Sequence, residues 1–283
     1  MHKRDTEKKR LMEKIKFHPE KTTERLKKLN EYYKKNIQID SKFICSKYSI
    51  CQPSHPGDFY EGQLSYLGKL YDSLNTEFPF RIMIVGQEYG TKDRFVSIEN
   101  RAEMIHKSAE LSFTQRNPHM RGTTSVLRLL FNKELGRDTD SEFLTVNNEK
   151  YHILDAFALV NFLLCSAINS NEGKKGKSTK EMKLNCSKHF RASLEILEPT
   201  VIVLQSKSFN EFFLGVFDNV ELLHDNLYIG KINNRKMFLT CFTHPSTPTN
   251  KGNWGRDEKT PYLLKVVTPT IKYLLTDYSK IFQ

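Results

Sequence analysis

Polar residues follow three apolar runs of this sequence in a way that could form one site. The runs end in a first motif, Gly86, Gln87 and Glu88, in Asn161, and in a loop from His244 to Ser246. Parallel strands bring their carboxyl ends to one edge of a sheet, where ligands commonly bind. A carboxylate, an amide and an imidazole gathered there could orient water, recognise a planar polar group and stabilise an anion.

The three segments, in this order, resemble the motifs of the uracil-DNA glycosylase superfamily, closest to its iron-sulfur branch. Members of that superfamily carry a Gly-Gln-Asp-Pro-Tyr-like or Gly-Glu-Ala-Pro-Gly-like first motif, a strand-end Asn and a His-Pro-Ser loop. The resemblance covers roughly residues 45–246, with gaps. It implies an enzyme that flips uracil or another non-standard pyrimidine out of DNA and hydrolyses its N-glycosidic bond, leaving an abasic site.

The resemblance also implies roles for single residues. His244 would stabilise the negative charge that develops on the departing base, and Asn161 would pair with O4 and N3–H of uracil. Phe95 would stack on the flipped base, unless it is a core residue. Gly86 and Tyr89 would contact the base beside them.

The first motif departs from the family because no proline follows its acidic position. In one alignment Glu88 takes the place of the catalytic acid, with Asp93 as a second carboxylate nearby. In the other alignment Gln87 fills that place and would contact the substrate. We expect Glu88 to be the catalytic group.

Two further segments are predicted to contact DNA. The loop after His244 contains Ser246, the single Trp254 and Arg256, and the family uses this loop as a wedge in the minor groove. A tryptophan that anchors the loop on the core is the alternative. A basic stretch with Lys174 and Lys175 is placed to touch phosphates.

Four of the five cysteines follow the order of the iron-sulfur glycosylases, although both pairs are more widely spaced than in that family. We expect a [4Fe-4S] cluster, with zinc or unliganded thiols as alternatives. Cys241 ends an apolar run and is expected in the core. The predicted ligands are Cys45, Cys51, Cys165 and Cys186.

Composition agrees with a globular protein that binds a polyanion. The 283 residues include 44 Lys and Arg against 33 Asp and Glu, a net charge of +11. The first residues lack the apolar segment of a signal peptide, and no apolar run is long enough to span a membrane. We therefore expect a soluble cytoplasmic protein with DNA as its partner and no obligate protein partner.

Apolar runs and helical periodicities alternate along the chain. The predicted strands are 80–85, 158–164, 201–204 and 237–242, and the predicted helices are 98–111, 124–131, 179–197 and 209–216. This alternation predicts a three-layer α/β/α fold with a mostly parallel central sheet. Residues 1–42 are expected to form a basic helical or disordered extension, and residues 43–283 a glycosylase-like domain.

Two alternatives to a repair enzyme stay open. The altered first motif and the long segment 114–150 leave room for a hypermodified cytosine of foreign phage DNA, which would make the protein a defence enzyme. A non-catalytic glycosylase-like module that binds DNA is the other alternative.

Overall fold

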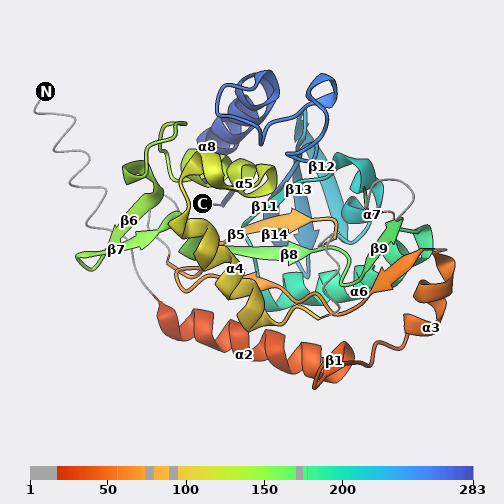
Figure 1. Cartoon of the computed structure of the whole chain (residues 1–283). Helices are drawn as coiled ribbons and strands as arrows, with labels where there is room; N and C mark the ends of the chain where they lie inside the picture. Colours follow the sequence, from red (N-terminus) through yellow and green to blue (C-terminus); the bar gives the residue numbers. More distant parts are fainter. Residues whose placement is uncertain are drawn as a thin grey trace, which may run out of the picture.

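The computed structural model describes residues 18–55, 57–73, 80–88, 95–169, 175–176 and 178–282. A sheet of seven strands forms the centre, in the order β12-β13-β14-β11-β5-β8-β4 (Figure 1). Its strands are β4 (Tyr66–Leu67), β5 (Ile82–Gly86), β8 (Phe157–Asn161), β11 (Val201–Leu204), β12 (Asn219–His224), β13 (Leu227–Ile232) and β14 (Arg235–Cys241).

The sheet is mixed. The four middle strands, β14, β11, β5 and β8, pair in parallel. Strands β4, β13 and β12 add antiparallel edges, so three of the six described pairings are parallel and three antiparallel. The α/β class is confirmed, but the predicted mostly parallel sheet holds only for the middle strands.

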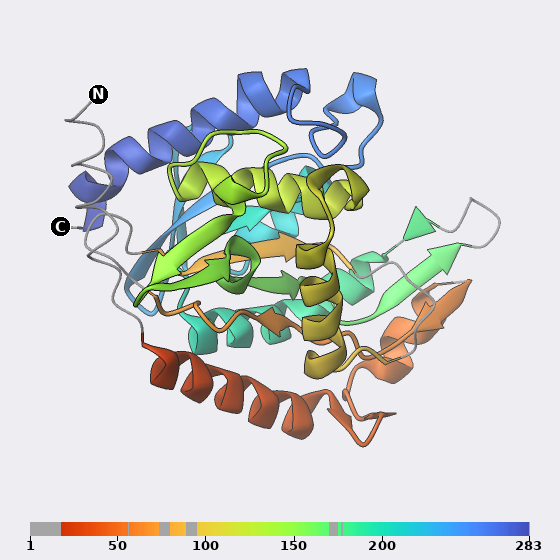
Figure 2. The ribbon, with the colours of Figure 1, turned by 60° about the vertical axis from the view of Figure 1, so that its left-hand side comes forward.

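Helices lie on both faces of this sheet (Figure 2). Successive side chains of a strand point to opposite faces. In β5, Ile82 and Ile84 join a core with α5 (Pro118–Leu130) and α8 (Thr268–Phe282). Met83 and Val85 join a second core with α2 (Pro19–Asn36) and α6 (Lys180–Leu197).

The described part of the N-terminal segment is packed and not an exposed extension. Leu29 and Tyr33 of α2 are 0% and 1% exposed and belong to the same core as α6. Arg25 donates to Asp72 and to Glu198 at the end of α6. The described helix α2 therefore packs against the rest of the fold. The expected arm at residues 1–17 lies outside the described residues.

Both ends of helix α6 are set by local features of the sequence. The side chain of Thr179 accepts from the N–H of Met182 at 3.2 Å and so caps the first turn. The helix ends at Glu198, which adopts a left-handed conformation. The other predicted helices are present as α4 (Ile98–Glu110), α5 and α7 (Asn210–Leu214), with α5 starting six residues earlier than expected.

Among the described residues no helix is both long and apolar enough to cross a bilayer.

Short elements surround this framework. The small elements are β1 (Gln38–Ile39), β2 (Lys42–Phe43), α3 (Tyr48–Cys51), β3 (Asp58–Tyr60), β6 (Phe143–Val146), β7 (Glu149–His152), β9 (Ser166–Asn169) and β10 (Lys175–Gly176).

A buried ionic cluster holds α5 against the β6–β7 hairpin. Glu142, 1% exposed, lies 2.6 Å from Arg116, 3.1 Å from Arg128 and 3.0 Å from His152. Burial alone would raise the pKa of Glu142, but hydrogen bonds from His152 and Arg116 lower this pKa to about 2. The carboxylate is therefore ionised in the folded protein and fixes both ends of α5.

Candidate functional site

The predicted strand ends meet at one edge of the sheet. Gly86 of β5 and Asn161 of β8 are partners in the parallel ladder. Beside them a pocket of about 420 Å³ opens between α4 and α5. Its described lining residues are Glu88, Arg101, Met104, Ile105, Ser108, Asn117, Pro118, His119, Met120, Leu159, Asn161, His244 and Ser246.

Asn161 is held in one orientation. Its Oδ1 accepts from Nη2 of the buried Arg101 at 3.3 Å. Because a guanidinium only donates, the oxygen of the amide faces Arg101 and the nitrogen is the other atom. That Nδ2 is buried and has no hydrogen-bond partner among the described residues. A buried N–H group of this kind requires an acceptor, which a bound ligand can supply.

Gly86 leaves the space that this amide occupies. A Cβ atom at residue 86 would lie 3.0 Å from Asn161 Oδ1 and 3.8 Å from His119 Nε2. Glycine is therefore the residue that permits the close approach of β5 to the amide. Gly86 therefore lies beside the pocket that Asn161 and His119 line.

His244 also lines the pocket, and its neighbours assign the proton of its ring. The backbone N–H of Ser246 lies 3.2 Å from Nδ1, and Ser246 Oγ lies 2.7 Å from the same atom. Because a backbone N–H only donates, Nδ1 accepts, and the neutral ring carries its proton on Nε2. Burial lowers the pKa of His244, which keeps the ring neutral. His244 is therefore a neutral N–H donor at the pocket.

A second imidazole, His119, was missed by the sequence analysis. Its ring centroid lies 5.8 Å from that of His244, at an interplanar angle of 31°. Burial, together with the nearby His244 and Arg101, lowers the pKa of His119 to about 3. The available signal was Asn117-Pro118, a helix cap followed by a first-turn proline, which places His119 at the start of α5.

Glu88 supplies a carboxyl group at the pocket. Its Oε2 accepts from the N–H of Ala167 at 3.0 Å, and Oε1 accepts from Gln87 Nε2 at 3.3 Å. Burial raises the pKa of Glu88 to about 7, and these two hydrogen bonds offset the rise only in part. Such a group can take up a proton near neutral pH.

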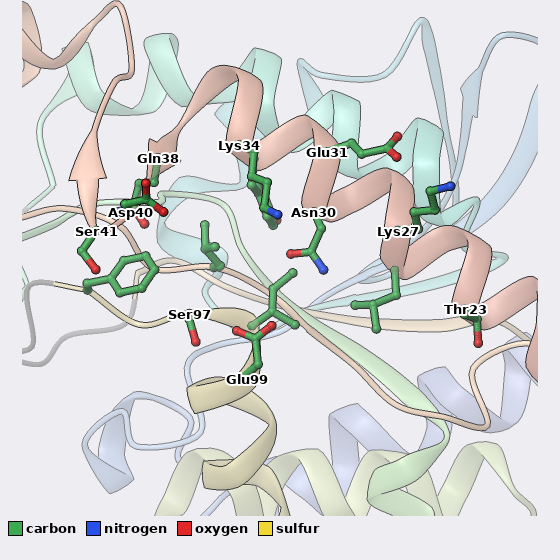
Figure 3. Close-up of a pocket in the computed structure, with 15 residues that line it drawn as sticks. Thr23, Lys27, Asn30, Glu31, Lys34, Gln38, Asp40, Ser41, Ser97 and Glu99 are labelled. Atoms are coloured by element: carbon green, nitrogen blue, oxygen red, sulfur yellow. The ribbon is translucent and has the colours of Figure 1, made fainter.

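Two predicted substrate contacts lie outside this pocket. The amide of Gln87 is bonded to Ser178 and Ser206 and is not among the lining residues. Phe95 lines a different groove of about 530 Å³ between α2 and α4. Figure 3 shows this groove, whose polar residues include Lys27, Glu31 and Glu99. The structure therefore does not place Phe95 where it could stack on a base held by Asn161.

The predicted wedge is also corrected. Trp254 is 0% exposed, packs on Phe242 and donates from Nε1 to the carbonyl of Thr243 at 2.6 Å. A side chain without exposed surface cannot enter a DNA groove, so Trp254 anchors the loop on the core. Ser246 and Arg256 of the same loop are exposed.

Some predicted residues are not placed. Tyr89, Asp93 and Lys174 lie outside the described residues. For Lys175 the backbone is described, in β10, but not the side chain.

The four predicted cysteine ligands come together from three separate segments. Cys45, Cys51, Cys165 and Cys186 all line one small cavity with His189. Burial raises the pKa of Cys165, and the Cys186, Cys45 and Cys51 thiols act in the same direction. Cys241, at 0% exposure, lies in the core away from this cavity, as expected.

The arrangement of these cysteines is not that of a single-ion site. Among the described residues no three His, Cys, Asp or Glu side chains are arranged to hold one metal ion. Four cysteine thiols are the type of donor set that binds a [4Fe-4S] cluster, and here they line one cavity.

Two comparisons with known proteins found no match. A scan against protein-family models found no match, and a search of curated protein sequences found none.

Proposed function

We propose that this protein is a DNA glycosylase, and that the pocket between α4 and α5 binds a flipped uracil or another non-standard pyrimidine. One observation carries the proposal: the oriented amide of Asn161, with its nitrogen unsatisfied, lies at the same pocket as the neutral His244. An amide in this state recognises a planar group that has a carbonyl. A neutral imidazole beside it stabilises an anion without first giving up a proton.

The chemistry follows from these groups. When the bond between the sugar C1′ and the base nitrogen breaks, its electron pair leaves with the base. The Nε2–H of His244 donates to the base oxygen that becomes negative, and Asn161 Nδ2 donates to a second carbonyl. Water adds to C1′ and passes its proton to the carboxylate of Glu88. The base anion then takes up a proton from solvent and Glu88 releases the proton that it received, so the products are the free base and an abasic sugar.

Several other features support DNA as the substrate. The net charge is +11, and exposed Ser246 and Arg256 lie on the loop that carries His244. Helices on both faces of a mixed sheet are compatible with a three-layer, glycosylase-like fold. In this proposal Cys45, Cys51, Cys165 and Cys186 would hold a [4Fe-4S] cluster that stabilises the surrounding structure.

A second candidate is a hypermodified pyrimidine. The pocket extends from Asn161 along one face of α4, past Met104, Ile105 and Ser108. Its volume of about 420 Å³ is within the range of pockets for ligands much larger than uracil. A base with an added group would use this extension.

The substrate is tested by incubating the protein with oligonucleotides that carry uracil, hypoxanthine, cytosine or modified cytosines, and by probing for abasic sites. If uracil is the target, Asn161→Asp loses the donor to O4 and shifts preference toward cytosine, whose amino group donates instead. Asn219→Asp is the control, because residue 219 is exposed on the edge strand β12 and lies outside the pocket, so the preference should stay unchanged.

The outcomes of this panel separate the candidates. Strong uracil release by the wild type contradicts the hypermodified-base candidate. Release of a modified cytosine with little uracil release contradicts the uracil assignment. Abasic product from no substrate, together with retained DNA binding, would indicate a non-catalytic module.

Glu88 predicts a pH dependence. Because its folded pKa is about 7, most Glu88 side chains are protonated at pH 6, and the rate should rise as the pH increases through about 7. Glu88→Gln should lower the single-turnover rate about 10²-fold or more and remove this rise. Glu99→Gln, on the exposed start of α4, is the matched control. An unchanged profile in Glu88→Gln would show that Glu88 is not the base.

A further inference from the structure

Helix α6 contributes two residues to the cysteine cavity besides the predicted ligand Cys186. Asn185, Cys186 and His189 all line the cavity from this helix. Asn185 Nδ2 donates to Cys51 Sγ at 3.3 Å, and His189 Nε2 lies 3.5 Å from Cys45 Sγ. One helix thus contacts both cysteines of the N-terminal segment.

His189 is joined to a further residue on its other side. Its Nδ1 lies 2.8 Å from the hydroxyl of Tyr32 on α2, and its side chain is 3% exposed. A cysteine that binds iron is a thiolate and has no proton to donate. With Cys45 as a ligand, Nε2 must therefore carry the proton, and Nδ1 must accept from the Tyr32 hydroxyl.

We propose that Tyr32, His189 and Cys45 form a hydrogen-bond relay that stabilises the reduced state of the metal centre and slows its loss. This proposal rests on the [4Fe-4S] cluster in the proposed function. A donor to a ligand sulfur withdraws charge from the cluster, which raises its reduction potential. It also fixes the ligand, and partners of this kind commonly contribute 10- to 100-fold in metal affinity. His189 and Tyr32 are thus positioning residues for Cys45.

The test uses the full chain purified without oxygen. Brown wild-type protein with broad absorption near roughly 400 nm is the starting point, and replacement of any of the four cysteines should bleach it. His189→Leu should shift the reduction potential, followed by electron paramagnetic resonance, to a more negative value. It should also accelerate bleaching by a chelator roughly 10-fold.

Three variants separate a relay from a general packing effect. His189→Gln keeps an N–H donor and should restore most of the potential and the bleaching rate. Tyr32→Phe should shift both in the direction of His189→Leu but by less, and it tests the relay if His189→Leu does not fold. Leu184→Ala, at an exposed position of α6, should change neither.

Other results would overturn the relay. One is an unchanged reduction potential and bleaching rate in folded His189→Leu. The other is a strongly coupled histidine nitrogen in the pulsed electron paramagnetic resonance spectrum of the wild type, which would make His189 a ligand. Colourless wild-type protein, or stoichiometric zinc, would overturn the cluster itself. Glycosylase activity measured on the same samples reports separately on the proposed function.

Discussion

His244→Ala should lower single-turnover base release by about 10²- to 10³-fold, while the affinity for DNA changes little. The substitution removes one preorganised donor at the atom where negative charge develops. That charge is absent before the bond breaks, so the loss falls on the rate and not on binding. Rates with saturating enzyme, and binding measured on an uncleavable oligonucleotide, separate the two quantities.

Two controls accompany this variant. His106→Ala removes an imidazole that is 60% exposed and outside the pocket, and it should leave the rate unchanged. Ser246→Ala keeps the backbone N–H that orients the ring, so it should retain most of the rate. Loss of DNA binding in folded His244→Ala would contradict its role at the departing base.

Glu142→Gln should lower the free energy of unfolding by about 3–5 kcal/mol. The variant leaves Arg116 buried without its carboxylate partner, and it leaves Arg128 with Asp138 alone. Urea denaturation followed by circular dichroism measures the loss. Glu195→Gln removes a partly exposed partner of Arg191 and should cost less than about 1 kcal/mol. Equal losses in the two variants would contradict this interpretation of the buried cluster.

The carboxylate of Glu142 also predicts that the free energy of unfolding decreases at acid pH. Its folded pKa of about 2 lies below the usual glutamate pKa of 4.5, so the stabilisation is complete above pH 4.5. It is lost as the pH falls from 4.5 toward 2, and it amounts to about 3 kcal/mol. The difference between the wild type and Glu142→Gln should therefore shrink over this range. A difference that is constant with pH would show that charge is not its cause.

Local signals in the sequence predicted the middle of the fold well. Residues 201–204 were predicted as a strand and form β11. Residues 179–197 were predicted as a helix, and α6 covers Lys180–Leu197. Polar residues that follow parallel strands were expected to gather at one edge of the sheet, and Glu88, Asn161 and His244 do line one pocket. These predictions succeed because they depend on interactions between residues close in sequence, or on the parallel order of buried strands.

Contacts between distant segments were not predictable in this way. The burial of α2 depends on Leu29 and Tyr33 packing against α6. In the sequence these two residues stand among lysines, so the segment reads as polar. Phe95 and Trp254 were assigned to a site by their type, whereas packing places them elsewhere.

Two β-hairpins were overlooked although their turns are recognisable. Asn147 and Asn148 join β6 to β7, and Asn233 and Asn234 join β13 to β14, all four with positive φ. Asparagine tolerates this conformation, so an Asn-Asn pair between apolar segments is a hairpin signal.

Only three residues, Phe162, Leu163 and Leu164, separate the amide of Asn161 from the thiol of Cys165. Phe162 and Leu163 donate to the carbonyls of Gly86 and Gln87 at 2.9 and 2.8 Å, and the carbonyl of Leu164 accepts from Gln63 at 2.9 Å. These hydrogen bonds attach the backbone between the two side chains to the end of β5 and to the segment that precedes β4. If the proposed cluster binds Cys165, its site and the pocket of Asn161 would share this one hydrogen-bonded segment, and a change of backbone position at either site would reach the other through three residues.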